Sequence, residues 1–404
     1  LLPAALPFLQ TFFNNSGNNA DQLWEWLVSM RKYGLALGSL ASIYISIICG
    51  RKWPITIGMI IQLIGGVMCL FIKLGYCGIV AAFIGRFLNG FGSAILQTIG
   101  VSMMSEIPSV YCRGRVLASN VLWACAGELF GFFIGTDYAL GTEQLWPIAL
   151  FAPLALLPCC VIILYISAES PRFFILRDKI KEAKQSLKFY QVNLFRISII
   201  PHKNPTKLIL TRFSSGTFLK PLLIALFTQC FVHIDDWLWI TYSTQAFINF
   251  GYDARTSQIT TLLMAIPAVF ISISLVFYFE SFTRRSLLIA PTIGSILCSL
   301  LQKIKKIAIP ILASIDLCMA ALASESAYTV VPELFRLSDR TFGISLVIFL
   351  QNVYGGLLTT VILSIMNSNG LEYILIPLIV NNYCYILGIY FFLPETSGKT
   401  FKVR

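Results

Sequence analysis

The sequence has little charge and almost no histidine. Asp, Glu, Lys and Arg make up 12% of its 404 residues, about half of the roughly 25% found in soluble domains. Its two histidines, His202 and His233, stand far apart and outside any HExxH-type run, and its eleven cysteines form no CxxC pair. We interpret the cysteines as apolar packing residues. We expect no metal site, no cofactor and no enzymatic activity, because no nucleophile, base and metal ligand occur together.

Apolar residues are abundant instead, at 57% of the chain. This composition indicates a multi-pass membrane protein whose partner is the lipid bilayer, since a spanning helix needs about 20 apolar residues. We expect eleven spans, at residues 33–49, 54–72, 78–104, 115–136, 145–167, 218–249, 257–279, 286–301, 307–331, 341–365 and 372–393. The ninth of these is short for a membrane. Residues 1–13 resemble the end of one more helix. With no initiator Met before it, we interpret this first helix as truncated and expect no signal peptide.

The net charge of +11 comes from basic residues that are unevenly placed. If the long connection 168–217 is cytosolic, 22 Lys and Arg residues fall in cytosolic connections and seven, including Arg31 and Lys32, on the opposite side. Basic loops mark the cytosolic side of a membrane protein, so this charge does not indicate a nucleic-acid partner. We expect the plasma membrane, a cytosolic linker and a cytosolic C-terminus. The sequon at Asn14 then falls in an outer loop and predicts a glycoprotein.

The charged segment SEIPSVYCRGR at residues 105–115 has a counterpart, PELFRLSDR, in the second half of the chain. Glu106 and Arg113 recur 227 residues later as Glu333 and Arg340. Basic turns recur at Arg51 and Arg284, and acidic motifs recur at Glu169 and Glu395. Charges that recur at nearly fixed offsets indicate duplication, and two joined six-helix halves are a transporter architecture. We therefore divide the chain into an N-terminal half at 1–167, a cytosolic linker with short helices at 168–217 and a C-terminal half at 218–404.

These motifs resemble those of the sugar porter branch of the major facilitator superfamily, the relatives of facilitative glucose transporters. The matching segments are GRK after the second span, IGRFLNG and SEIPSVYCRGR around the fourth, AESPRFFILR, ESFTRR, VVPELFRLSDR and LPETSGKTF. The resemblance implies an all-α fold of two six-helix halves related by pseudo-two-fold symmetry. It also implies transport of a small polar solute, most simply a hexose-like sugar, by alternating access.

For the duplicated charges, the resemblance implies cytosolic salt-bridge clusters that hold the two halves together when the pore opens outward. The residues carried over are Arg51, Glu106, Arg113, Glu169, Arg172, Glu280, Arg284, Glu333 and Arg340. Removing one partner of a partly buried pair costs several kcal/mol, so such clusters are able to bias two states that differ by a few kcal/mol. The alternative is that the charges only fix helix ends and topology.

The resemblance is weaker at the substrate site. Amides and aromatic rings hold the sugar in this family, yet Val121 and Ala268 stand where a glutamine and an asparagine are usual. The residues that remain as candidates for lining the cavity are Asn120, Gln229, His233, Trp237, Tyr242, Tyr328, Gln351 and Asn352. The alternative for each of these residues is that it only packs between helices.

Two further functions stay open, one because of acidic residues inside the spans and one because of the missing sugar ligands. Asp235 and Asp236, with Arg86 as a candidate partner, and the additional acids Glu128 and Asp316 suit a cationic or proton-coupled solute. The loss of sugar ligands is also compatible with a sensor-like relative that does not transport.

Overall fold

The computed structural model describes residues 5, 17–108, 113–177, 179–190, 216–232, 234–304, 308–335, 339–370 and 372–395, and these form helices joined by short turns. The N-terminal half contains α2 (Gly17–Cys49), α3 (Lys52–Leu70), η1 (Phe71–Lys73), α4 (Tyr76–Glu106), α5 (Arg113–Ile134), α6 (Trp146–Phe151), η2 (Ala152–Leu156) and α7 (Leu157–Ile166). The connection contains α8 (Pro171–Leu176) and α9 (Ile180–Phe189). The C-terminal half contains α11 (Gly216–Val232), α12 (Ile234–Asn249), α13 (Ala254–Tyr278), η4 (Phe279–Ser281), α14 (Arg284–Ile304), α15 (Ile309–Leu334), α16 (Arg340–Thr359), α17 (Ile362–Asn369) and α18 (Glu372–Phe392).

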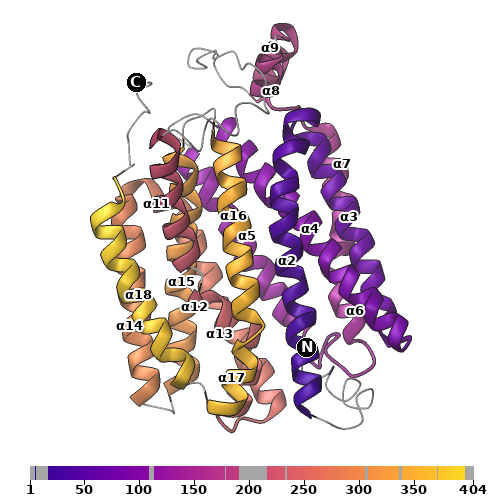
Figure 1. The fold of residues 1–404 in the computed structure, drawn as a ribbon, viewed down its shortest axis with the longest axis vertical. Helices are drawn as coiled ribbons and strands as arrows, with labels where there is room; N and C mark the ends of the chain where they lie inside the picture. Colours follow the sequence, from indigo (N-terminus) through magenta and orange to yellow (C-terminus); the bar gives the residue numbers. More distant parts are fainter. Residues whose placement is uncertain are drawn as a thin grey trace.

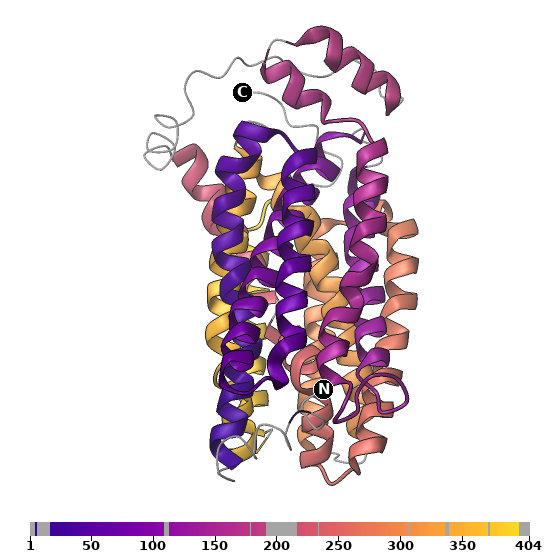
Figure 2. The ribbon, with the colours of Figure 1, turned by 90° about the vertical axis from the view of Figure 1, so that its right-hand side faces the viewer.

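The long helices form two bundles that stand side by side. Figure 1 shows the N-terminal bundle in indigo and purple and the C-terminal bundle in orange and yellow, with α2 and α16 along the junction. After a quarter turn the same helices run nearly parallel from one end of the molecule to the other (Figure 2). We call the end that carries α8 and α9 the linker end, and the opposite end the far end.

Ten stretches of the described helices are long and apolar enough to cross a membrane, and α11 adds a shorter apolar helix. Together with the α11–α12 pair, they correspond to the eleven expected spans. The prediction was wrong at two boundaries. The first span does not begin at residue 33, because α2 begins at Gly17, so Arg31 and Lys32 lie within the helix and not in an outer loop. The ninth span is not short, because α14 runs over Arg284–Ile304.

Besides the span that comprises α11 and α12, two expected spans contain more than one helix. The span at 145–167 passes through α6, η2 and α7. Pro153 and Pro158 lack the backbone N–H that a continuous α-helix needs, which explains the intervening 3-10 turn. The span at 341–365 is divided between α16 and α17. Gly370, at φ 91°, ends α17 in a conformation that favours glycine.

Helix α4 lies in the middle of the N-terminal bundle, in contact with α2 and α3. A Cβ atom added at Gly34 of α2 would overlap the carbonyl oxygen of Phe87 on α4. Gly65 of α3 and Gly85 of α4 approach each other in the same manner. Small residues at helix contacts allow the backbones to approach closely, which is a main source of packing energy between membrane helices.

Candidate functional site

The N-terminal half has a buried charge cluster at the linker end. The Arg51 side chain donates from Nη2 to Oε1 of Glu106 at 3.0 Å and from Nη1 to the Ser46 carbonyl at 3.0 Å. Ser170 donates its hydroxyl to the other Glu106 oxygen at 2.9 Å. The side chains of Arg51 and Glu106 are 8% and 1% exposed. The pair is therefore desolvated, and removing either partner would leave a buried charge.

Glu169 binds the beginning of α3 in the same cluster. Its two carboxylate oxygens accept the backbone N–H groups of Arg51 and Lys52, each at 3.0 Å. These N–H groups have no partner inside the helix, and the positive end of the helix dipole favours an anion here. The Lys52 ammonium returns to the same segment and donates to the Ser167 carbonyl at 2.9 Å. The acidic motif after α7 is thereby attached to the turn before α3.

The C-terminal half repeats the main arginine and glutamate contacts of this arrangement. Arg284 donates from Nη2 to Glu333 at 3.4 Å and from Nη1 to the Phe279 carbonyl at 3.3 Å. Glu395 accepts the backbone N–H groups of Arg284 and Arg285 at 3.0 and 3.3 Å. Glu280 adds a further ion pair with Arg284 at 3.1 Å. The recurrence of carboxylate, arginine and backbone contacts indicates that the two halves share one structural plan.

The ion pairs recorded among the described cluster residues lie within one half. Arg51 pairs with Glu106, and Arg284 pairs with Glu280 and Glu333. Across the junction the contacts are weaker hydrogen bonds. Arg340 of α16 donates to the Ser105 carbonyl of α4 at 3.4 Å.

Two further contacts cross the junction at the linker end. Nη2 of Arg51 lies 3.5 Å from the Thr341 hydroxyl at the start of α16. In the opposite direction, a Cβ atom added at Gly114, at the start of α5, would overlap Glu280 and would lie 3.0 Å from Nη2 of Arg284. The first turn of one helix from each half therefore touches the charge cluster of the other half.

The connection between the halves is attached to the N-terminal cluster. Ser186 of α9 and Tyr190, which directly follows this helix, donate their hydroxyl groups to the carbonyls of Glu169 and Ala168, respectively. Burial raises the pKa of the Tyr190 phenol, which keeps it neutral and able to donate. The linker helix therefore packs on the acidic motif that binds the start of α3.

The two halves also meet at the far end. Ser29 of α2 and Thr359 of α16 share a hydrogen bond of 3.0 Å, and the backbone N–H and hydroxyl of Ser364 donate to the two oxygens of Glu25 at 2.7 Å. Gln258 exchanges hydrogen bonds with Asp137 at 2.9 Å. Hydrogen bonds therefore join the halves at both ends of the bundle.

One candidate for lining the cavity lies at the middle of the junction. Tyr328 of α15 accepts a hydrogen bond at 2.9 Å from the amide of Gln97 on α4, so it connects the two halves. Gln97 is not among the residues predicted to line the cavity, because an amide within an apolar span gives no sign of the direction in which it points. Residues facing each other across the junction are found only in the structure.

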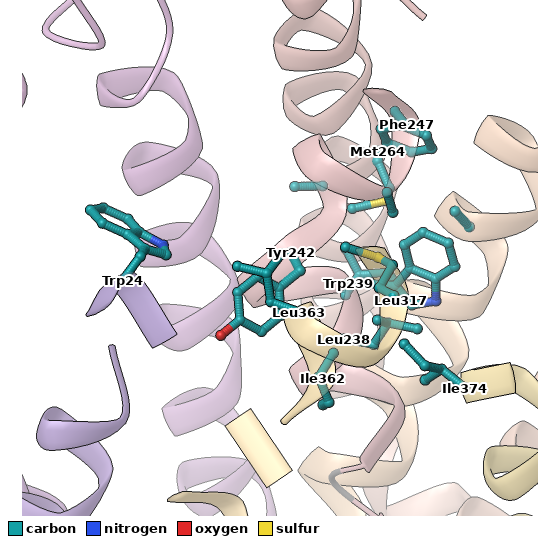
Figure 3. Close-up of a cluster of buried hydrophobic side chains, with 14 of the residues drawn as sticks. Trp24, Leu238, Trp239, Tyr242, Phe247, Met264, Leu317, Ile362, Leu363 and Ile374 are labelled. Atoms are coloured by element: carbon teal, nitrogen blue, oxygen red, sulfur yellow. The ribbon is translucent and has the colours of Figure 1, made fainter. Parts of the chain in front are cut away.

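The other candidates have different surroundings. Tyr242 of α12 is 2% exposed and donates to the Thr359 carbonyl at 2.9 Å. Figure 3 shows it projecting toward the side of the cluster where Trp24 of α2 lies. Gln351 and Asn352 of α16 are both 5% exposed, and Asn352 donates to the Ile348 carbonyl of its own helix.

The structure describes only some of the remaining predicted site residues. Gln229 is buried and Asn120 is half-buried. His233 and Asn14 lie outside the described residues. The side chains of Arg113, Arg172 and Trp237 also lie outside them. The side chains of Asp235 and Asp236 also lie outside them.

Asp316 is a buried acid within the C-terminal half, at 1% exposure. It accepts hydrogen bonds from Trp239 Nε1 at 2.9 Å and from the Ser295 hydroxyl at 2.5 Å, and Asn382 donates to Ser295 at 3.3 Å. Trp239 lies beside Leu317 in the apolar cluster of Figure 3. These contacts join α12, α14, α15 and α18, which gives the acid a clear packing role.

Comparisons with known proteins agree with this architecture. The family model described as "Sugar (and other) transporter" matches residues 4–403. The chain is 27% identical over 297 residues to the facilitated glucose transporter member 2 of Bos taurus, a match that covers 69% of this chain and 57% of the relative. It is 24% identical over 403 residues to the corresponding protein of Gallus gallus, covering 94% and 74%.

The structure of the major facilitator superfamily proton:xylose symporter XylE, bound to 6-bromo-6-deoxy-D-glucose, superposes with a TM-score of 0.79 at 17% identity. This match covers 99% of the chain and 93% of XylE. The likeness shows that the two helical bundles adopt the major facilitator fold. Together with the family match over almost the whole sequence, it establishes that the chain belongs to the sugar (and other) transporter family.

Proposed function

We propose that this protein moves a small polar solute across a membrane by alternating access, and that the solute is hexose-like. The duplicated charge clusters at the linker end are the observation that carries this proposal. The recorded ion pairs of each cluster join residues of its own half, and the described polar contacts between the halves at this end are hydrogen bonds. Two bundles that each have their own charge cluster and meet at one junction suit a rocking motion around a central site. The glucose transporters and the xylose symporter among its relatives support the same function.

In this proposal the predicted gate residues stabilise the state that is closed at the linker end. The contacts of Arg51 with Thr341 and of Arg340 with Ser105 support it, because both are lost when the halves separate. Arg113 and Arg172 stay in the proposed gate by their place in the duplicated motifs. Tyr328, at the junction, is the candidate for solute contact that the geometry supports best.

We also propose a plasma-membrane protein with a cytosolic linker and C-terminus, glycosylated at Asn14. The basic residues of the connection support this orientation. Treatment with a glycosidase should change the electrophoretic mobility of the wild-type protein and leave Asn14→Gln unchanged. Equal mobility of both proteins before and after treatment would contradict the assignment.

Counterflow of labelled glucose and xylose into proteoliposomes that contain the full chain tests the transport function. We expect saturable exchange that is absent from empty liposomes. Tyr328→Phe removes the hydroxyl that Gln97 contacts, and it should weaken exchange severalfold. Tyr278→Phe is the matched control, because Tyr278 is 64% exposed on the outside of the bundle. Binding of sugar without exchange would favour the sensor-like alternative. Exchange of labelled organic or inorganic cations, without exchange of either sugar, would favour the alternative of a cationic solute.

A further inference from the structure

Helix α17 is separated from α16 by a short break at Thr360 and Val361, toward the far end of the C-terminal bundle. The Thr359 hydroxyl donates to the Gly356 carbonyl at 3.0 Å, and the Thr360 hydroxyl donates to the Leu357 carbonyl at 2.7 Å. Threonine hydroxyls that bond back to carbonyls of the preceding turn bend a helix. The eight residues of α17 therefore form a segment of their own, and its first N–H groups have no carbonyl partner inside the helix.

The N-terminal half supplies the partner for this first turn. Glu25 of α2 is 2% exposed, and its two carboxylate oxygens accept the backbone N–H and the hydroxyl of Ser364, each at 2.7 Å. Ser364 is the third residue of α17, so its N–H belongs to this first turn. A carboxylate at this position also interacts favourably with the helix dipole. Glu25 therefore caps a helix of the other half, whereas Glu169 and Glu395 cap α3 and α14 within their own halves.

Apolar packing surrounds this contact on both sides of the junction. Trp24 and Leu27 of α2 lie in the same buried cluster as Ile362 and Leu363 of α17, and Figure 3 shows Trp24, Ile362 and Leu363 among its members. The carboxylate of Glu25 is therefore desolvated while the halves are together, and its hydrogen bonds offset that cost. Once the halves separate at this end, water replaces both hydrogen bonds. The contact between Glu25 and α17 thus stabilises the closed arrangement alone.

We propose that Glu25 and α17 form the gate that closes the far end of the protein. This inference rests on the proposed carrier function and assigns the residues of a second gate, at the end opposite to the duplicated charge clusters. In the closed state Glu25 caps α17 across the junction. When this end opens, Ser364 loses its cap and Glu25 becomes hydrated, so opening also loosens the first turn of α17. Solute enters or leaves at the far end only after this contact has broken.

The accessibility of one cysteine near each end of the protein tests this gate. The full chain is placed in nanodiscs, with the exposed native cysteines removed. Leu363→Cys then reports on the far end and Leu117→Cys on the linker end, because these leucines are 0% and 1% exposed. A hydrogen bond to a charged group contributes about tenfold to an equilibrium constant. We therefore expect Glu25→Gln to raise the maleimide reactivity of Leu363→Cys about tenfold. Because alternating access closes one end as the other opens, the reactivity of Leu117→Cys should not rise.

Glu143→Gln is the matched control, because Glu143 is an exposed glutamate at the same end. It should leave both reactivities at the reference values. Ser364→Ala removes the hydroxyl and keeps the backbone N–H, so it should raise the reactivity of Leu363→Cys by a smaller factor than Glu25→Gln. This second variant keeps the proposal testable if Glu25→Gln does not fold.

Three results would overturn the proposal. Equal reactivity of Leu363→Cys with and without Glu25→Gln would show that the carboxylate does not hold the far end closed. A rise at both cysteines would assign Glu25 to the general stability of the fold. The same rise with Glu143→Gln would show that the change does not act through Ser364. Failure of glucose and xylose counterflow would refute the proposed function separately, because the two reactivities are measured without solute.

Discussion

Replacing Arg340 by alanine should open the linker end of the protein. Its guanidinium donates to the Ser105 carbonyl across the junction, and its side chain is 2% exposed. A hydrogen bond from a charged donor contributes about 1.5–3 kcal/mol. At 3.4 Å this bond is long, so we take the lower value. Because the bond exists only while the halves are closed at this end, its loss shifts the equilibrium about tenfold toward the open state.

The shift is measurable with a cysteine placed in the apolar cluster beneath this contact. Leu117 is 1% exposed and packs with Phe342 and Phe335 from the other half. In a background without the exposed native cysteines, Leu117→Cys should react with a maleimide about tenfold faster when Arg340→Ala is also present. The measurement in nanodiscs needs no assumption about which end faces the cytosol.

Arg285→Ala is the matched control for this experiment. Arg285 lies at the same end and donates to the Leu393 carbonyl at 2.6 Å, within its own half. Its loss weakens the closed and the open states equally, so the reactivity of Leu117→Cys should stay at the reference value. Equal rates in the reference, Arg340→Ala and Arg285→Ala proteins would refute the reasoning.

Three other predictions concern packing and capping. Gly34→Ala should lower the melting temperature, because overpacking against α4 costs about 1–3 kcal/mol, whereas Gly100→Ala, with open space around its Cβ, should not. Glu169→Gln should destabilise the protein by about 1 kcal/mol through loss of the charge at the start of α3, and an unchanged denaturation midpoint would contradict this role. Gln97→Ala and Tyr328→Phe should be non-additive in a double-mutant cycle of stability, and simple additivity would show that their bond contributes nothing.

The duplication of the charged motifs was predictable from the sequence. Ionised residues are rare in an apolar chain, so charged residues that recur at a nearly fixed offset are easily recognised. Glu106 and Glu333 were placed in the same role by sequence alone, and both contact the arginine of the preceding basic turn. The partners were less predictable. The resemblance implies salt bridges that hold the halves together, which stays a prediction, and the ion pairs recorded among the described residues join helices within a half. Pairing depends on how helices converge, which spacing along the chain does not specify.

The predicted helix boundaries were wrong where charged residues interrupt an apolar run. Arg31 and Lys32 interrupt the first apolar run in the sequence, but α2 continues through them, and Asn89 of the neighbouring helix accepts a hydrogen bond from Arg31. The amide that stabilises the charge lies far away in the sequence. The same reason limited prediction of the candidate site, since the hydrogen bond between Gln97 and Tyr328 depends on the contact of two helices from different halves.

The distribution of strong and weak contacts bears on how the proposed carrier moves. The buried ion pairs and the capped helix starts act within one half, so they keep each bundle rigid in every state. The described polar contacts across the junction on the linker side include hydrogen bonds of 3.2–3.5 Å, and Gly114 closely approaches Glu280. These three bonds contribute a few kcal/mol in total, which is the scale on which a solute is able to shift two conformations. We infer that hydrogen bonds of this size are compatible with exchange between the two proposed states.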